Sequence, residues 1–225
     1  MKLILASSGF EAPESVQKCI EFVGKPAKKI SFAIINEAYA VEEGDHSWVV
    51  DDIINIRNNF GGEIEFINLL ALPLSDIERR IRTKDVIFCV GGNTEYLMSV
   101  FEKTGFDKLL PKLLKEKVYV GSSAGSMVLG VQPPLALQTA FYGEELDYGI
   151  KKYLELIDET ILPHLDSPHF NNFRHRDRYL PAFAKIPKAY FLSDTSALVV
   201  DDDKTYPIGK NYIKLENGQT TEDVK

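Results

Sequence analysis

The chain has 225 residues, 44% of them hydrophobic, and no repeat or low-complexity tract, so we expect a single domain over residues 1–225. Its formal net charge is −7, with acidic and basic residues mixed throughout, which argues against nucleic acid and anionic membrane surfaces as partners. The apolar start is too short for a signal peptide and no apolar run reaches the roughly 18 residues of a membrane span, so we expect a cytoplasmic protein.

Apolar runs and amphipathic segments alternate along the first half of the chain. Four apolar runs predict strands, at residues 2–8, 29–36, 64–70 and 86–90. Strands without polar alternation are covered on both faces, so this half predicts an α/β fold in which a mostly parallel sheet lies between two layers of helices. Ligands of such sheets bind at the carboxyl ends of the strands.

Two of the intervening segments have apolar residues at helical spacing. The first places Val16, Ile20 and Val23 on one face. The second covers residues 47–60, and its apolar face is expected to hold Val50, Ile53, Ile54 and Ile56. The two cysteines, Cys19 and Cys89, lie in a predicted helix and a predicted strand, where reduced core thiols are expected rather than a disulfide or a metal site.

A further apolar run, residues 118–120, leads into Gly121-Ser-Ser-Ala-Gly125 and then into another apolar run. This is the G-x-S-x-G pattern of a nucleophile elbow, in which glycines flank a serine at a cramped turn between a strand and a helix. The turn exposes the hydroxyl of Ser123, and the following helix supplies free N–H groups where an oxyanion forms. We therefore predict Ser123 as the nucleophile and the N–H of Ala124 as an oxyanion donor. A turn that only packs a helix closely on a strand is the alternative.

A second glycine turn follows the strand at residues 86–90. There, Gly91 and Gly92 precede Asn93 and Thr94, either of which could cap the next helix. If this strand neighbours the elbow strand, an N–H of one of the glycines would point at the nucleophile and act as a second oxyanion donor. A loop that cradles a phosphate is the alternative, although the wider glycine motifs of such loops are missing.

A serine nucleophile needs a base, and the base needs an acid that orients it. Of the four histidines, His164 directly follows an apolar strand, residues 160–162, and is the favoured base. His169, in the loop beyond it and likewise after a proline, is the rival, whereas His46 precedes a helix far back in the chain and His175 lies among arginines.

Asp194 is the favoured acid because it follows an apolar run, residues 189–192, and would lie at a strand end. Asp166 is the rival, being close to His164 in the sequence. The remaining tail predicts short antiparallel strands at residues 206–209 and 212–215.

Four motifs, taken in this order, resemble the peptidase E (aspartyl dipeptidase) family of serine peptidases, which are related to cyanophycinase. They are Gly-Gly-Asn-Thr at 91–94, Gly-Ser-Ser-Ala-Gly at 121–125, Pro-His at 163–164 and an acid after a late apolar strand, and they run along essentially the whole chain. The resemblance implies a three-layer αβα fold similar to the class I glutamine amidotransferase domain, with serine in place of cysteine as the nucleophile. It also implies that Gly92 and Ala124 donate to the oxyanion, that His164 acts as base and then acid, and that Asp194 holds His164, at a position where glutamate is found in the family.

The resemblance further implies a basic residue after the catalytic histidine that reads an N-terminal aspartate of the substrate. In this chain the corresponding segment is rich in arginine but does not align cleanly with the family pattern. Candidate substrate-binding residues are Asn93, Arg174, Arg176 and Arg178, the arginines as bidentate partners of a carboxylate. A solvated helix face is the alternative for the arginines.

The sequence thus predicts a serine hydrolase that cleaves a short peptide through an acyl-enzyme, with no metal or cofactor, as a monomer or homodimer. Two alternatives stay open at this point. One is a non-enzymatic module of the same fold that binds an anion or another ligand, and the other is an esterase or amidase that acts on a non-peptide substrate.

Overall fold

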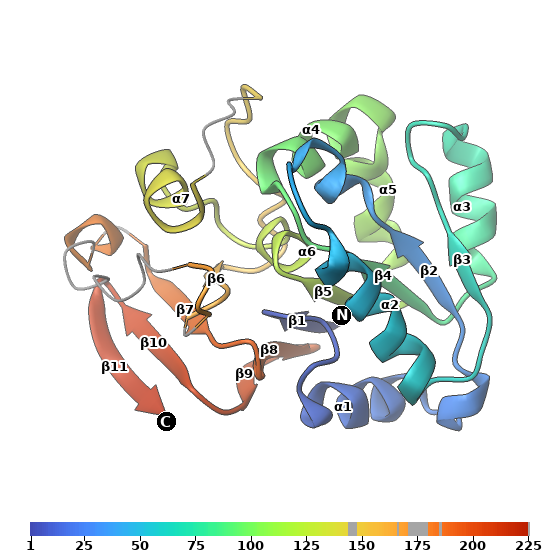
Figure 1. The fold of residues 1–225 in the computed structure, drawn as a ribbon, viewed down its shortest axis with the longest axis horizontal. Coiled ribbons are helices and arrows are strands. Elements are labelled where there is room, and N and C mark those ends of the chain that lie inside the picture. Colours follow the sequence, from blue (N-terminus) through green and yellow to red (C-terminus); the bar gives the residue numbers. More distant parts are fainter. Residues whose placement is uncertain (144–147, 166, 171–179, 185, 225) are drawn as a thin grey trace.

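The computed structural model describes residues 1–143, 148–165, 167–170, 180–184 and 186–224. A seven-stranded sheet has the order β3-β2-β4-β5-β1-β8-β9 (Figure 1). Its strands are β1 (Lys2–Ala6), β2 (Phe32–Ile35), β3 (Ile64–Phe66), β4 (Val86–Cys89), β5 (Val118–Ser122), β8 (Ser196–Asp201) and β9 (Lys204–Gly209). Strands β1 to β5 pair in parallel, and β8 and β9 extend the sheet beside β1 in antiparallel orientation. The predicted mostly parallel sheet is confirmed.

Helices cover both faces of this sheet. Successive side chains of a strand point to opposite faces, so neighbouring residues of one strand pack beneath different helices. Ile4 of β1 packs in the core beneath α1 (Pro13–Val23) and α2 (Ser47–Asn59). Its neighbour Leu3 packs in the core on the other face, beneath four further helices. These are α3 (Leu74–Arg82), α4 (Thr94–Thr104), α5 (Phe106–Leu113) and α6 (Ala124–Met127). The three-layer αβα arrangement is therefore as predicted.

A second, four-stranded sheet has the order β11-β10-β7-β6. Its strands are β6 (Glu159–Leu162), β7 (Lys188–Leu192), β10 (Tyr212–Glu216) and β11 (Gln219–Val224). Helix α7 (Leu135–Tyr142) packs on it through Leu137 and Phe141, which share a core with Phe191 of β7. The antiparallel pairing of β10 with β7 and β11 agrees with the predicted tail. Sequence reasoning does not predict that β6 and β7 leave the main sheet.

Three short 3-10 helices complete the described elements: η1 (Ala27–Lys29), η2 (Glu37–Val41) and η4 (Leu180–Phe183). Strand β3 is shorter than the predicted run and ends at Phe66. The apolar residues of α1 that are buried are Val16, Cys19 and Phe22. Of the three residues predicted to face inward, Val16 is therefore buried, whereas Ile20 and Val23 are only half-buried. Cys19 and Cys89 are both buried free thiols.

The predicted inward face of α2 is wrong at two positions. Val50 and Ile54 are 57% and 47% exposed, whereas Ile56 is fully buried. One side of α2 packs in the apolar core, and an adjoining side lines a cavity through Trp48, Asp51, Asp52 and Asn55. No helix in the described part of the chain has the length and apolar character needed to cross a membrane.

Candidate active site

Ser123 lies at the sharp turn between β5 and α6, with φ 50° and ψ −113°. Residues other than glycine rarely adopt positive φ, and backbone strain of this kind concentrates at functional sites. The Ser123 N–H donates to the carbonyls of Ala6 (3.1 Å) and Ser7 (3.0 Å), which ties the turn to the end of β1. A Cβ on Gly121 would lie 2.6 Å from the backbone of Gly125, so close approach requires the glycine. The strand-turn-helix context of the predicted elbow is therefore present.

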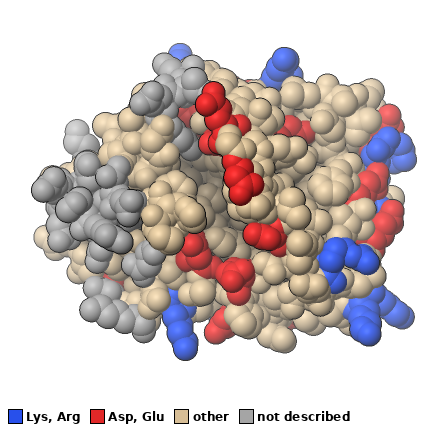
Figure 2. Space-filling model, in the orientation of Figure 1, with Lys and Arg blue, Asp and Glu red and all other residues tan. Residues whose placement is uncertain are grey.

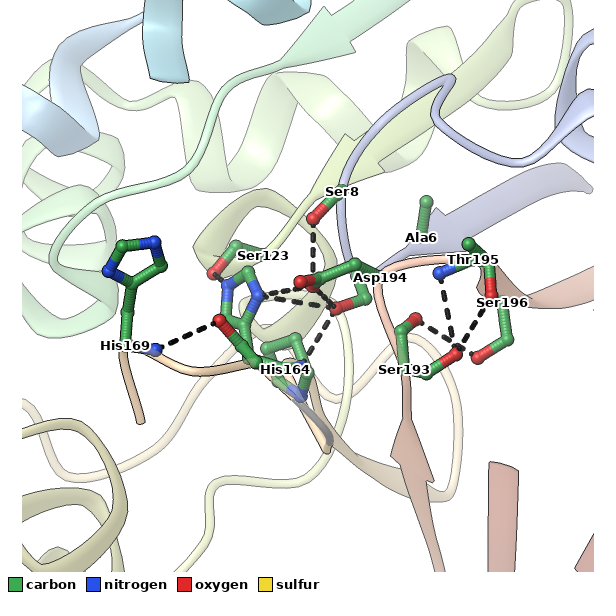
Figure 3. Close-up of polar contacts among 12 residues, drawn as sticks. Ala6, Ser8, Ser123, His164, His169, Ser193, Asp194, Thr195 and Ser196 are labelled. Atoms are coloured by element: carbon green, nitrogen blue, oxygen red, sulfur yellow. Dashed lines mark hydrogen bonds and ion pairs between the residues drawn. The ribbon is translucent and has the colours of Figure 1, made fainter. Parts of the chain in front are cut away.

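The imidazole of His164 faces the Ser123 hydroxyl. Its Nε2 lies 2.9 Å from Ser123 Oγ (Figure 3). His164 follows β6 of the second sheet and has a positive φ of 69°. Its backbone N–H donates to Ser7 Oγ at 2.8 Å, and its ring stacks on Phe170 with centroids 4.8 Å apart. These two contacts hold both the backbone and the ring plane of His164.

The carboxylate of Asp194 accepts a hydrogen bond from the other ring nitrogen of His164, Nδ1. His164 Nδ1 and Asp194 Oδ1 are 2.6 Å apart (Figure 3). Asp194 lies between β7 and β8, where the chain passes from the second sheet to the first. The hydroxyls of Ser7 and Ser8 each donate to the same Oδ1 at 2.9 Å. With Nδ1 protonated, Nε2 is free to accept the proton of the Ser123 hydroxyl.

These hydrogen bonds decide the charge of Asp194. Burial of the carboxyl favours its neutral form, but the hydrogen bond and charge of His164, together with the hydroxyls of Ser8 and Ser7, outweigh burial and lower the pKa of Asp194 below its usual value. Asp194 is therefore ionised at neutral pH, as a residue that stabilises an imidazolium must be.

The three side chains open onto a cavity of about 690 Å³. Ser123, His164 and Asp194 line it together with Gly91, Gly92 and Met127. Tyr142 and Phe170 form an aromatic side of the cavity. The loop that connects η2 to α2, together with α2 itself, forms an acidic side. A cavity of this size can accept a ligand of a few residues.

The glycine turn after β4 lies beside the elbow, because β4 and β5 are neighbours in the sheet. A Cβ on Gly91 would lie 3.0 Å from the Cβ of Ser123. Gly92 has φ +125°, and a Cβ there would collide with the backbone of Ala38 in η2. Ala124 is the first residue of α6, so its N–H has no acceptor within that helix. This placement supports the roles expected of Gly92 and Ala124 as oxyanion donors, which stay predictions.

A comparison with known protein families shows to which family this chain belongs. The profile of Peptidase family S51 matches residues 3–208. The chain belongs to peptidase family S51. The predicted resemblance to peptidase E is thereby confirmed, and family membership makes the protein a peptidase.

Relatives of this S51 peptidase bear similar descriptions. A Pasteurella multocida protein described as an uncharacterized peptidase is 29% identical over 222 residues, which is 96% of this chain and 97% of the relative. A Listeria monocytogenes protein, also described as an uncharacterized peptidase, is 26% identical over 61% of this chain and 66% of its own length. Among solved structures, a Listeria monocytogenes protein provisionally described as a peptidase E superimposes with a TM-score of 0.74 at 24% identity, over 92% of this chain and 98% of that one. That likeness supports the fold.

The candidate substrate-binding residues of the S51 peptidase are placed less clearly. Asn93 is 3% exposed, and its Oδ1 accepts the N–H of Tyr96 as the cap of α4, as expected for one of its two predicted roles. A substrate contact from Asn93 would have to come from its amide nitrogen. Arg174, Arg176 and Arg178 lie outside the described residues, as do His175 and Asp166. Their roles therefore stay predictions.

Several residues at this site are missed by sequence reasoning. Ser7 and Ser8 contact the acid, but serines after a short strand carry no local signature of this role. The one available signal is their position at the carboxyl end of β1, where ligands of parallel sheets gather. His169, the less favoured candidate for the base, and His46, expected in a solvated region before a helix, both line the cavity, and Phe170 stacks on His164.

Proposed function

We propose that this S51 peptidase hydrolyses short peptides through an acyl-enzyme formed on Ser123. The observation that carries the proposal is the continuous line from Ser123 Oγ to His164 Nε2 (2.9 Å) and from His164 Nδ1 to Asp194 Oδ1 (2.6 Å) at the edge of a cavity. Nucleophile, base and acid are in the order and at the distances that acyl transfer by serine requires.

The reaction proceeds in two halves. Ser123 Oγ attacks the peptide carbonyl carbon while His164 Nε2 takes the hydroxyl proton, and the N–H groups of Gly92 and Ala124 donate to the oxyanion. His164 then gives this proton to the departing amine, which leaves the acyl group as an ester of Ser123. A water molecule deprotonated by His164 attacks the ester, and the acid product departs as Ser123 recovers its proton. Asp194 stays ionised throughout and stabilises the imidazolium.

A dipeptidase-like activity on substrates with a free N-terminus fits the limited size of the cavity. Selection of an N-terminal aspartate would need a cation for its carboxylate, and Arg174, Arg176 and Arg178 are the candidates in the sequence. An esterase or an amidase acting on a non-peptide substrate would use the same three groups.

The test is hydrolysis of a dipeptide panel, beside a simple ester, by the wild type and Ser123→Ala. We expect Ser123→Ala to lower kcat by several orders of magnitude, about 10⁴-fold or more. Ser99→Ala is the matched control, because the Ser99 hydroxyl donates to the Tyr96 carbonyl on α4 and Ser99 is not among the described residues that line the cavity. Unchanged dipeptide hydrolysis in Ser123→Ala would rule the mechanism out, and turnover of the ester alone would redirect the proposal to an esterase.

A further inference from the structure

Helix α2 turns an acidic face toward the cavity that contains Ser123. Trp48, Asp51, Asp52 and Asn55 all line the cavity, and their spacing of three and four residues places them on one side of the helix. The loop that leads into α2 contributes Glu42, Glu43 and Asp45, and Glu11 completes the wall. We call these six carboxylates, Glu11, Glu42, Glu43, Asp45, Asp51 and Asp52, the acidic wall.

No lysine or arginine among the described lining residues balances the acidic wall. Within the described part of the chain, none of the six carboxylates has a lysine or arginine nitrogen within 4.0 Å, whereas acids elsewhere, such as Asp76, Glu78 and Asp85, are paired with cations. Acidic side chains gather along the central hollow of the face shown in Figure 2, and basic side chains lie toward its outer edges. The described lining of the cavity is therefore negatively charged, and this charge attracts cations and repels anions.

The wall is close to the chemistry. The position that a Cβ on Gly91 would occupy is 3.0 Å from Ser123 Cβ and 3.5 Å from the Trp48 ring, so one glycine separates the indole from the nucleophile. Asp52 is only 7% exposed and lies beneath this region, against Gly9. An indole face beside carboxylates suits an ammonium or guanidinium group with an aliphatic stem.

An organic cation fits the wall better than a metal ion does. In the residues that the structure describes, no three or more histidine, cysteine, aspartate or glutamate side chains are arranged to hold a metal. Four of the wall's carboxylates, Glu11, Glu43, Asp45 and Asp51, are solvent-exposed, so they act through their charge over the width of the cavity.

We propose that the acidic wall selects peptides whose N-terminal residue is lysine or arginine. This inference rests on the proposed function, because Ser123, and not the acids, marks the cavity as a substrate site. The α-amino group and the basic side chain supply two positive charges on the acyl side of the scissile bond, and the acidic wall and Trp48 hold them while Ser123 attacks. The products are a free basic amino acid and the remaining peptide. A peptide with an N-terminal aspartate instead brings a negatively charged side chain toward the carboxylates of the acidic wall. The repulsion between these like charges disfavours its binding.

The test compares kcat/KM for Lys-Ala, Arg-Ala, Ala-Ala and Asp-Ala at low ionic strength. We expect the basic dipeptides to exceed Ala-Ala by about tenfold or more and Asp-Ala by more than that, with the difference mainly in KM and reduced by about 0.5 M salt. The double variant Glu42→Gln/Asp51→Asn should reduce the ratio of Lys-Ala to Ala-Ala by about fivefold. Glu102→Gln is the matched control, an exposed acid on α4 away from the cavity, and should leave the ratio unchanged.

A second readout separates failure of this inference from failure of the proposed function. Lys-Ala and Asp-Ala are compared as protectors of Ser123 against labelling by a fluorophosphonate probe. Labelling of Ser123 with equal protection by the two dipeptides, or with better protection by Asp-Ala, would overturn the basic preference and leave the serine mechanism in place. Absence of labelling and of any dipeptide hydrolysis would overturn both.

Discussion

The hydroxyl of Ser7 links Asp194 to the backbone of His164. Ser7 Oγ donates to Asp194 Oδ1 at 2.9 Å and accepts the His164 N–H at 2.8 Å. Ser7 is fully buried at the end of β1, so it fixes two parts of the proposed triad that arrive from the second sheet against the first. We infer that Ser7 is a positioning residue, since it touches the acid and the base and not the cavity's contents.

Substitution of Ser7 should cost more activity than substitution of Ser8. Both hydroxyls donate to Asp194 Oδ1, but only Ser7 also accepts from the positive-φ backbone of His164. We expect Ser7→Ala to lower kcat by about tenfold or more, because small displacements of a base are costly, and Ser8→Ala to lower it by about threefold. The measurement is kcat and KM for one dipeptide. Equal losses in the two variants would show that the bond to the His164 N–H has no role in positioning.

Asp194 is expected to be the acid that orients the base. Asp194→Asn removes the acceptor that selects the Nδ1-protonated tautomer of His164, so kcat should fall by about 10⁴-fold while the fold is kept. Asp166→Asn is the matched comparison, since Asp166 is the rival acid in the sequence. Steady-state kinetics on both variants, with circular dichroism to check folding, decides between them. A large loss in Asp166→Asn and a small one in Asp194→Asn would reverse the assignment.

Gly92 should be intolerant of any side chain. It combines φ +125° with a close approach to the backbone of Ala38, so Gly92→Ala should lower the free energy of unfolding and remove most activity. Gly24→Ala is the control for positive φ alone, because φ is +68° there and, apart from its chain neighbours, no atom of the described residues lies within 4 Å of the added Cβ. We expect the free energy of unfolding, measured with urea, to fall by about 1 kcal/mol in Gly24→Ala and by about twice that or more in Gly92→Ala. Similar values for the two would contradict the close approach.

The free energy of unfolding should depend on pH because of Asp52. Burial first, and then the charges of Asp51 and Glu11, raise the pKa of Asp52 from 3.8 to about 7, against a hydrogen bond from Ser122. The folded state therefore binds a proton that the unfolded state has lost between these two values. The resulting contribution to stability is complete below about pH 3.8 and is lost as pH rises through about 7.

Replacement of Asp52 should remove this dependence. Between pH 5 and 8.5 the free energy of unfolding of the wild type should fall by about 3 kcal/mol relative to Asp52→Asn, which has no proton to lose. Glu102→Gln, at an exposed position on α4 whose charge is not among the causes of the Asp52 pKa shift, should follow the wild type. The measurement is urea unfolding at the two pH values, and a constant difference between wild type and Asp52→Asn would contradict the shifted pKa.

The main sheet and the elbow are readable from the sequence because their signals are local. Buried parallel strands appear as continuous apolar runs, and the turn at Ser123 needs glycines at fixed positions on either side. The association of His164 and Asp194 with this turn could be predicted because residues at strand ends converge in such folds. The interpretation of residues 1–225 as one domain stays a prediction.

The remaining features depend on tertiary contacts that no local pattern records. Strands β6 and β7 look like any buried strand, so their departure to a second sheet is not visible, and nor is the route by which His164 reaches the elbow from there. Val50 and Ile54 have the spacing of an inward face, but α2 is rotated so that Asp51 and Asp52 face the cavity. The hydrogen bonds of Ser7 depend on two residues more than 150 positions away in the chain.

The most direct measurement for the central claim is covalent labelling by a fluorophosphonate probe, with the modified residue identified by mass spectrometry of the digested protein. We predict one equivalent of label on Ser123, with labelling strongly slowed in His164→Ala because Ser123 Oγ then lacks the acceptor at 2.9 Å. Label on another residue, or labelling of Ser123 at an unchanged rate in His164→Ala, would contradict a nucleophile activated by this histidine.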